Sequence, residues 1–113
     1  VDSLPALRSN LRSFGLEDSV VPIVGSSEIV GRFWNISLSM VFIDGGHSLE
    51  SALADYRIWS RRLISGGNLA IHDEFEDPSI GGQAPREIFE LAQRSGLFHR
   101  ETLHQTLGVL RKL

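Results

Sequence analysis

The sequence predicts an α/β domain built on a mostly parallel β-sheet. Segments with apolar residues at helical spacing alternate with short segments rich in β-branched residues, which favours parallel strands joined by right-handed helical crossovers. The segments at 38–44 and 68–75 have almost no polar alternation, as expected of strands covered on both faces. The segments near 97–104 and 106–112 are close enough in sequence to form a closing antiparallel hairpin.

The N-terminal elements are a helix, a strand and a short helix. Apolar residues recur at spacings of three and four between residues 4 and 14, and Gly15 is placed to end that helix. The stretch VVPIV at 20–24 predicts a strand, and its proline favours an edge position because it offers no N–H to a ladder. Ser26 or Ser27 can cap the short helix that follows.

The clearest helix follows residue 48. Its apolar stripe consists of Leu49, Ala52, Leu53, Tyr56, Trp59 and Leu63. The remaining positions include Arg57, Arg61 and Arg62, a pattern typical of a solvated face. Residues 65–67 are expected to end this helix before the strand at 68–75, and a later helix around 86–95 has its own apolar face. The inner residues of that later helix are Ile88, Phe89 and Ala92.

Composition limits the class of function. A chain of 113 residues with 42% hydrophobic residues fits one domain, residues 1–113, with a modest core. Its net charge of −3 argues against a cationic surface for nucleic acid. The sequence has no cysteine, which excludes disulfides and cysteine–zinc sites. Without a signal peptide or an apolar run approaching the roughly 18 residues that span a bilayer, we expect a soluble cytoplasmic protein without a membrane partner.

Both buried strands end abruptly in polar residues. The stretch VFIDGGHS, residues 41–48, passes from three large apolar residues to an acid, two glycines and a histidine. The strand at 68–75 ends similarly, in a histidine followed by an acid. Ligands of parallel sheets bind beyond the carboxyl ends of the strands, so these side chains are expected at one site. They are Asp44, His47, His72 and Asp73.

Other interpretations of these residues remain open. Asp44 could instead cap the helix that starts near Ser48. Gly45 and Gly46 could form only a tight turn, or could allow the close approach of a ligand. His72 and Asp73 leave a buried strand together, which is costly unless they are paired or bind something.

The order of these pieces resembles a known family. The stretch VFIDGGHSLESALADYRIWSRRLISGGNLAIHDEF, residues 41–75, is similar to the second half of a class I S-adenosylmethionine-dependent methyltransferase. It resembles the subgroup whose fourth strand ends in FIDG-x-H and whose fifth ends in HD. The closing TLGVLRK, residues 106–112, and the upstream LRSNLRSFGLEDSVVPIVGSS, residues 7–27, also match that subgroup.

The resemblance implies a three-layer Rossmann-like sheet, truncated at the N-terminus to about five strands. In the family strand order 3-2-1-4-5-7-6, the glycine-rich cofactor loop and the acid ending strand two would precede Val1. The cofactor implied is S-adenosylmethionine. The residues of this chain that would contact it are Gly25, Ser26, Ser27, Asp44, Gly45 and His47.

The resemblance also implies a reaction. Acids that end strands four and five of relatives can hold a divalent cation, so Asp44 and Asp73 are expected to bind Mg²⁺ or Mn²⁺. His72 and Asp73 are the expected catalytic residues, with a histidine available to take the proton of a substrate hydroxyl. The predicted activity is O-methyl transfer to a small-molecule or sugar hydroxyl.

A truncated sheet has a consequence for assembly. Without strands one and two, the strand at 20–24 must either move beside the strand at 38–44 or pair with a second chain. An uncovered sheet face also favours self-association, so a homo-oligomer is expected. Two other functions remain open: a non-catalytic oligomerising or interaction module derived from this fold, in which the fragment is inactive, and a metal-dependent hydrolase.

Overall fold

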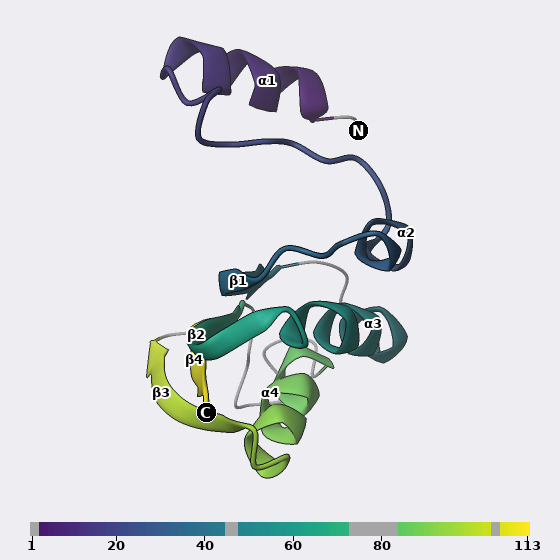
Figure 1. The fold of residues 1–113 in the computed structure, drawn as a ribbon, viewed down its shortest axis with the longest axis vertical. Coiled ribbons are helices and arrows are strands. Elements are labelled where there is room, and N and C mark those ends of the chain that lie inside the picture. The colour runs from purple at the N-terminus through teal and green to yellow at the C-terminus, as the bar shows by residue number, and fades with distance from the viewer. Residues whose placement is uncertain (1–2, 45–47, 73–83, 105–106) are drawn as a thin grey trace.

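The computed structural model describes residues 3–44, 48–72, 84–104 and 107–113. Helices and strands alternate among the described residues from 27 to 104, as the sequence predicts (Figure 1). In chain order the elements are α1 (Leu4–Ser13), α2 (Ser27–Arg32), β1 (Leu38–Ile43), α3 (Leu49–Ser60), β2 (Leu63–Ile71), α4 (Ala84–Arg94), β3 (Phe98–His104) and β4 (Leu107–Lys112). None of the helices in these described ranges is long and apolar enough to cross a bilayer.

The strands form one sheet in the order β1-β2-β4-β3. β1 and β2 are parallel, with Ile43 opposite Ile71, and β4 pairs antiparallel with both β2 and β3. Three of the four strands in the described part of the chain therefore run in one direction, and the predicted C-terminal hairpin is present. This order matches the 4-5-7-6 portion of the family order implied by the sequence. The α/β class is confirmed.

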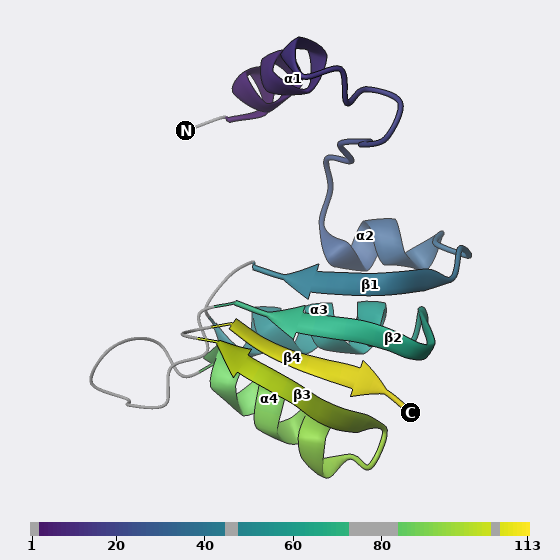
Figure 2. The same ribbon diagram turned by 90° about the vertical axis from the view of Figure 1, so that its left-hand side faces the viewer.

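The hydrophobic core lies on one face of the sheet. Val41, Leu69 and Leu110 are neighbours across three strands and all are buried. Figure 2 shows α3 and α4 together behind this face of the sheet. The predicted inner residues of α4 are buried there: Ile88, Phe89 and Ala92.

The opposite face of the sheet departs from the three-layer expectation. Met40 and Phe42 on β1 alternate with buried Val41 and are 56% and 52% exposed. Among the described residues, α3 and α4 share one face, so this part of the chain has two layers. The uncovered apolar side chains agree with the exposed sheet face expected from the truncated order.

The predicted strand at residues 20–24 is not formed. This segment has no regular secondary structure, and Val21 and Val24 are 75% and 77% exposed. A strand is stable only with a neighbour that takes up its backbone N–H and C=O groups, and Pro22 has no N–H to offer. The described part of the sheet therefore has four strands instead of about five, with β1 at its edge. Figure 1 shows α1 and this segment apart from the sheet.

The start of β2 is also earlier than predicted. The strand begins at Leu63, and residues 65–67 lie within it instead of ending a helix. Gly66 has φ +83°, and a Cβ on Gly67 would lie 2.9 Å from the carbonyl oxygen of Ile64. Glycines therefore let the strand continue through a sharply bent backbone next to the irregular pairing of Leu38.

Candidate functional site

The carboxyl ends of β1 and β2 bring two predicted site residues together. Asp44 directly follows β1 and His72 directly follows β2. The backbone N–H of His72 donates to the carbonyl of Ile43 at 3.0 Å, which extends the parallel pairing to the sheet rim. Asp44 Oδ1 lies 2.9 Å from His72 Nδ1. The prediction that adjacent strand ends deliver an acid and a histidine to one place holds for this pair.

The Asp44–His72 contact has a chemical consequence for the imidazole ring. A carboxylate can only accept, so it selects the ring form in which Nδ1 carries the proton and donates it. In the neutral ring the basic nitrogen is then Nε2. The side chains of His72 and Asp44 are 41% and 50% exposed, so the pair lies at the surface of the rim. The Phe42 ring flanks the imidazole at a centroid distance of 6.2 Å.

Three further predicted residues, Gly25, Ser26 and Ser27, lie in the loop before α2 and at the first position of that helix. Ser26 caps α2, because its hydroxyl accepts from the backbone N–H of Ile29 at 3.2 Å. The Ser27 hydroxyl donates to Asp55 Oδ1 at 2.5 Å and accepts from Trp59 Nε1 at 3.1 Å. The loop is therefore bonded to one face of α3.

A polar cleft of about 320 Å³ lies where the starts of α2 and α3 meet. Ser48 caps α3 by accepting from the backbone N–H of Ser51 at 3.2 Å, so Asp44 is not the cap of this helix. The cleft contains hydroxyl and carboxylate side chains from both helices. Its lining consists of Ser26, Ser27, Glu28, Ser48, Glu50, Ser51, Ala54 and Asp55. Of the described residues that the sequence assigned to the cofactor, Ser26 and Ser27 line this cleft, and Asp44 is not among its lining residues.

A second hollow, also about 320 Å³, adjoins the same loop, and most of the residues that line it are apolar. Val21 and Ile23 supply one side of it, and the Trp34 and Trp59 rings supply another. These two rings pack edge to face with centroids 5.4 Å apart. Gly25, Ser26 and Ser27 line this hollow and the two serines also line the cleft, so these residues border both.

Several predicted site residues lie outside the described residues. They are Gly45, Gly46, His47 and Asp73. Within the described ranges, no group of three or more histidine, aspartate or glutamate side chains is arranged to hold a metal ion. The predicted Mg²⁺ or Mn²⁺ site at Asp44 and Asp73 therefore stays a prediction.

The cleft also contains residues that the sequence analysis missed. Ser51 and Asp55 face it from α3, and Trp59 bonds to the Ser27 hydroxyl, although Trp59 was assigned only to the core stripe. A signal was present, because positions 48, 51, 55 and 59 recur at spacings of three and four and share one helix face. The side chains at these positions are able to hydrogen-bond, which distinguishes this face from a purely apolar one.

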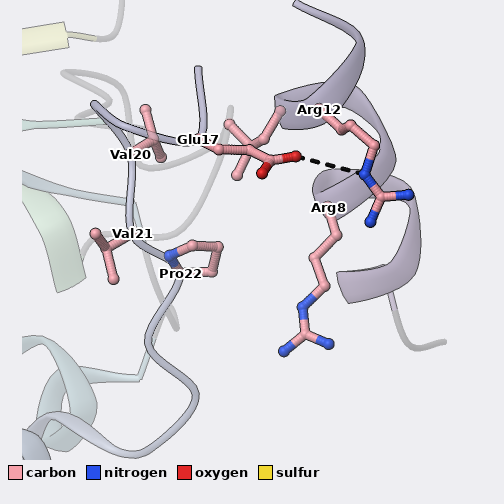
Figure 3. A pocket seen from close by; sticks show the side chains of 7 residues that line it. Arg8, Arg12, Glu17, Val20, Val21 and Pro22 are labelled. Carbon is pink, nitrogen blue, oxygen red and sulfur yellow. Dashed lines mark ion pairs between the residues drawn. The ribbon is translucent and has the colours of Figure 1, made fainter. Parts of the chain in front are cut away.

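A separate pocket of about 300 Å³ lies between α1 and residues 17–22. Figure 3 shows Arg8 and Arg12 from the helix on one side and Val20, Val21 and Pro22 on the other. Arg12 Nε pairs with Glu17 at 3.4 Å, and both side chains are largely exposed. None of the predicted site residues lines this pocket, so it is distinct from the rim that carries Asp44 and His72.

Comparisons with solved structures agree with the fold. A proposed caffeoyl-CoA O-methyltransferase from Staphylococcus aureus superposes with a TM-score of 0.75 at 16% identity, covering 97% of this chain. A proposed rRNA methylase from Clostridium thermocellum gives 0.65 at 16% identity over 94% of this chain. An rRNA methylase from Streptococcus thermophilus gives 0.66 at 21% identity over 98%. At these identities the likeness concerns the fold.

The chain is shorter than these neighbours. It spans 59%, 64% and 68% of the Staphylococcus, Clostridium and Streptococcus proteins, respectively. A family model described as a methyltransferase domain matches residues 1–74, which include α1, α2, β1, α3 and β2. This match contains the loop before α2 and the rim at Asp44 and His72. The chain therefore belongs to the methyltransferase domain family, with a class I S-adenosylmethionine-dependent methyltransferase fold.

Proposed function

We propose that this chain forms part of an enzyme that transfers a methyl group from S-adenosylmethionine to a hydroxyl oxygen of a small molecule. In this proposal His72 takes the hydroxyl proton and Asp44 orients the imidazole ring. The observation that carries the proposal is the 2.9 Å contact between Asp44 Oδ1 and His72 Nδ1 at the ends of adjacent parallel strands. Small-molecule sites of this sheet class lie beyond such strand ends.

The described residues suit the nucleoside end of the cofactor. Serine hydroxyls and carboxylates in the polar cleft can bond to a base amino group and to ribose hydroxyls. The adjoining apolar hollow, with its two tryptophan rings, suits the flat face of a base. The cleft volume of about 320 Å³ lies at the low end of small-molecule sites. When bound, the cofactor supplies the methyl group and leaves as S-adenosylhomocysteine.

His72 would handle the proton. With Nδ1–H donated to Asp44, the ring accepts a proton at Nε2, and the imidazolium that forms is stabilised by the adjacent carboxylate. The proton leaves the substrate oxygen as this oxygen gains its bond to the methyl carbon. Methyl transfer also requires in-line alignment of the reacting atoms, so residues that place the substrate matter as much as the base.

The divalent metal remains part of the proposal, without a step assigned to it. Of the two predicted metal ligands, Asp44 is the one within the described residues, and its carboxylate has the oxygen chemistry that Mg²⁺ or Mn²⁺ prefers. In the structure this carboxylate accepts a hydrogen bond from His72, so a metal at Asp44 would compete with that bond. Activity measured with and without a chelator distinguishes a metal bound at Asp44 from an Asp44 that only orients His72.

The test is methyl transfer from labelled S-adenosylmethionine to a panel of small hydroxyl-bearing acceptors, with the product identified by mass spectrometry. His72→Gln is expected to lower kcat about 100-fold, while calorimetric titration shows unchanged affinity for S-adenosylhomocysteine. Glu101→Gln is the matched control, because Glu101 pairs with Arg111 on the C-terminal hairpin. Equal kcat values for His72→Gln and the unsubstituted protein would refute the role of His72.

A second candidate function is assembly with another copy of this chain. It is favoured by the exposed apolar side chains on β1 and on the segment at 20–24, and by the position of β1 at the edge of the described sheet. An edge strand can pair with a strand of a second copy, and the segment at 20–24 has the β-branched composition for it. This function is compatible with catalysis and is tested separately.

A further inference from the structure

The Ser27 hydroxyl joins α2 to α3. Ser27 is the first residue of α2, and its hydroxyl donates to Asp55 Oδ1 at 2.5 Å. The same oxygen accepts from the indole N–H of Trp59 at 3.1 Å. Both bonds are partly buried, and the first involves a carboxylate, which makes it a strong hydrogen bond. The hydroxyl's only proton is therefore committed to Asp55.

The two partners of Ser27 are spaced to hold it. Asp55 and Trp59 are four residues apart on α3, so they lie one above the other on one helix face. Ser27 bridges this single turn. Trp59 also packs against Trp34, which follows the other end of α2. The start and the end of α2 are thus both held to the same face of α3.

The position of α2 depends on such contacts. A helix of six residues is too short to be stable by itself. Gly31 packs so closely on Ile58 that an added methyl group would overlap the isoleucine side chain. The Arg62 guanidinium adds bonds to the carbonyls of Gly31 and Trp34 at 2.8 and 3.4 Å. Of these anchors, the Ser27 bridge is the one next to the predicted cofactor loop.

We propose that Asp55 and Trp59 are positioning residues that act through the Ser27 hydroxyl to fix the Gly25–Ser26–Ser27 loop for cofactor binding. Ser26 immediately precedes Ser27 and lines both the polar cleft and the apolar hollow. A shift of Ser27 would therefore move both surfaces at once. The proposal rests on the proposed function for its ligand, but the bridge itself exists in the ligand-free protein.

The first test compares binding of S-adenosylhomocysteine in five variants. Ser27→Ala, Asp55→Ala and Trp59→Phe are each expected to raise Kd about tenfold, as loss of a charge-assisted or partly buried hydrogen bond would. The double variant Ser27→Ala/Asp55→Ala is expected to match the single variants, because both remove one interaction. Ser27→Thr keeps the hydroxyl and should bind like the unsubstituted protein.

Controls separate positioning from direct contact and from general destabilisation. If Asp55→Ala weakens binding while Ser27→Ala and Trp59→Phe do not, Asp55 contacts the ligand directly and the positioning role is overturned. Positioning predicts a higher KM for S-adenosylmethionine with kcat unchanged, whereas loss of folded protein would lower kcat as well. Ser19→Ala and Asp18→Asn, in the turn after α1, are matched surface controls.

Amide hydrogen exchange tests the bridge without a ligand. Ser27→Ala and Asp55→Ala are expected to speed exchange in residues 29–32 of α2 and to leave α4 unchanged. Unchanged exchange in α2 would overturn the proposal. If the unsubstituted protein binds no S-adenosylhomocysteine, the proposed function fails, and the exchange rates alone decide whether the bridge holds the loop.

Discussion

Replacing Gly108 by alanine should destabilise the fold by a calculable amount. Gly108 lies on β4 opposite Ile71, and a Cβ there would be 2.5 and 2.7 Å from two carbons of the Phe89 ring. Phe89 belongs to the buried cluster between α4 and the sheet, so its ring has little room to move. Overpacking of a core costs about 1–3 kcal/mol. Alanine regains about 0.5–1 kcal/mol of strand propensity. The middle of each range gives a net loss of about 1.3 kcal/mol.

The assay is thermal and urea unfolding followed by circular dichroism. At about 4 °C per kcal/mol for a domain of this size, Gly108→Ala should lower Tm by about 5 °C. The double variant Gly108→Ala/Phe89→Leu should lose less than the sum of its parts, because the smaller side chain vacates the contested space. Ser39→Ala, an exposed position on β1, is the control. An unchanged or higher Tm for Gly108→Ala would refute the close packing of Phe89 on β4.

Three other predictions concern titration, helix ends and assembly. Burial raises the pKa of Tyr56, and a hydrogen bond with Ser95 lowers it by a smaller amount. The unfolded state therefore loses the phenol proton first, so the free energy of unfolding should fall above about pH 10. Tyr56→Phe should flatten this decline, and the same pH profile in both proteins would contradict the prediction. Arg62→Met removes donors to three carbonyls and should lower the free energy of unfolding in urea by about 1–3 kcal/mol. A loss no larger than that of Arg61→Met, at an exposed position, would count against these bonds. The exposed side chains of Met40, Phe42 and the segment at 20–24 predict a dimer in sedimentation equilibrium at micromolar concentration, and a monomer would be the opposing result.

Local sequence patterns predicted the elements that are determined by residues close to one another in the sequence. The uninterrupted apolar strand at 38–44 became β1, and the C-terminal hairpin formed as expected. Ile88, Phe89 and Ala92 are buried because helical spacing alone decides which face of α4 is apolar. The meeting of Asp44 and His72 was also predictable, since parallel neighbouring strands end at the same rim.

Features that depend on partners distant in sequence were not predictable from local patterns. The segment at 20–24 has the composition of a strand but lacks a described neighbour, so it remains irregular. Arg62 was expected on a solvated face, yet its guanidinium satisfies carbonyls at the ends of α2 and α3. Asp55 likewise has the pattern of a surface acid, and only the fold brings Ser27 to it across 28 residues.

The most direct test of the proposed site is backbone amide NMR during titration with S-adenosylhomocysteine. We expect the largest shift changes at Ser26 and Ser27, which line the cleft and the hollow, and at Asp44 and His72, which pair at the sheet rim. The two tryptophan indole signals should also be affected. The pocket beside α1, near Arg8 and Arg12, should be unaffected. Shift changes confined to α1 or to the C-terminal hairpin, with the β1 and β2 ends unchanged, would contradict the assignment of the cofactor to this rim.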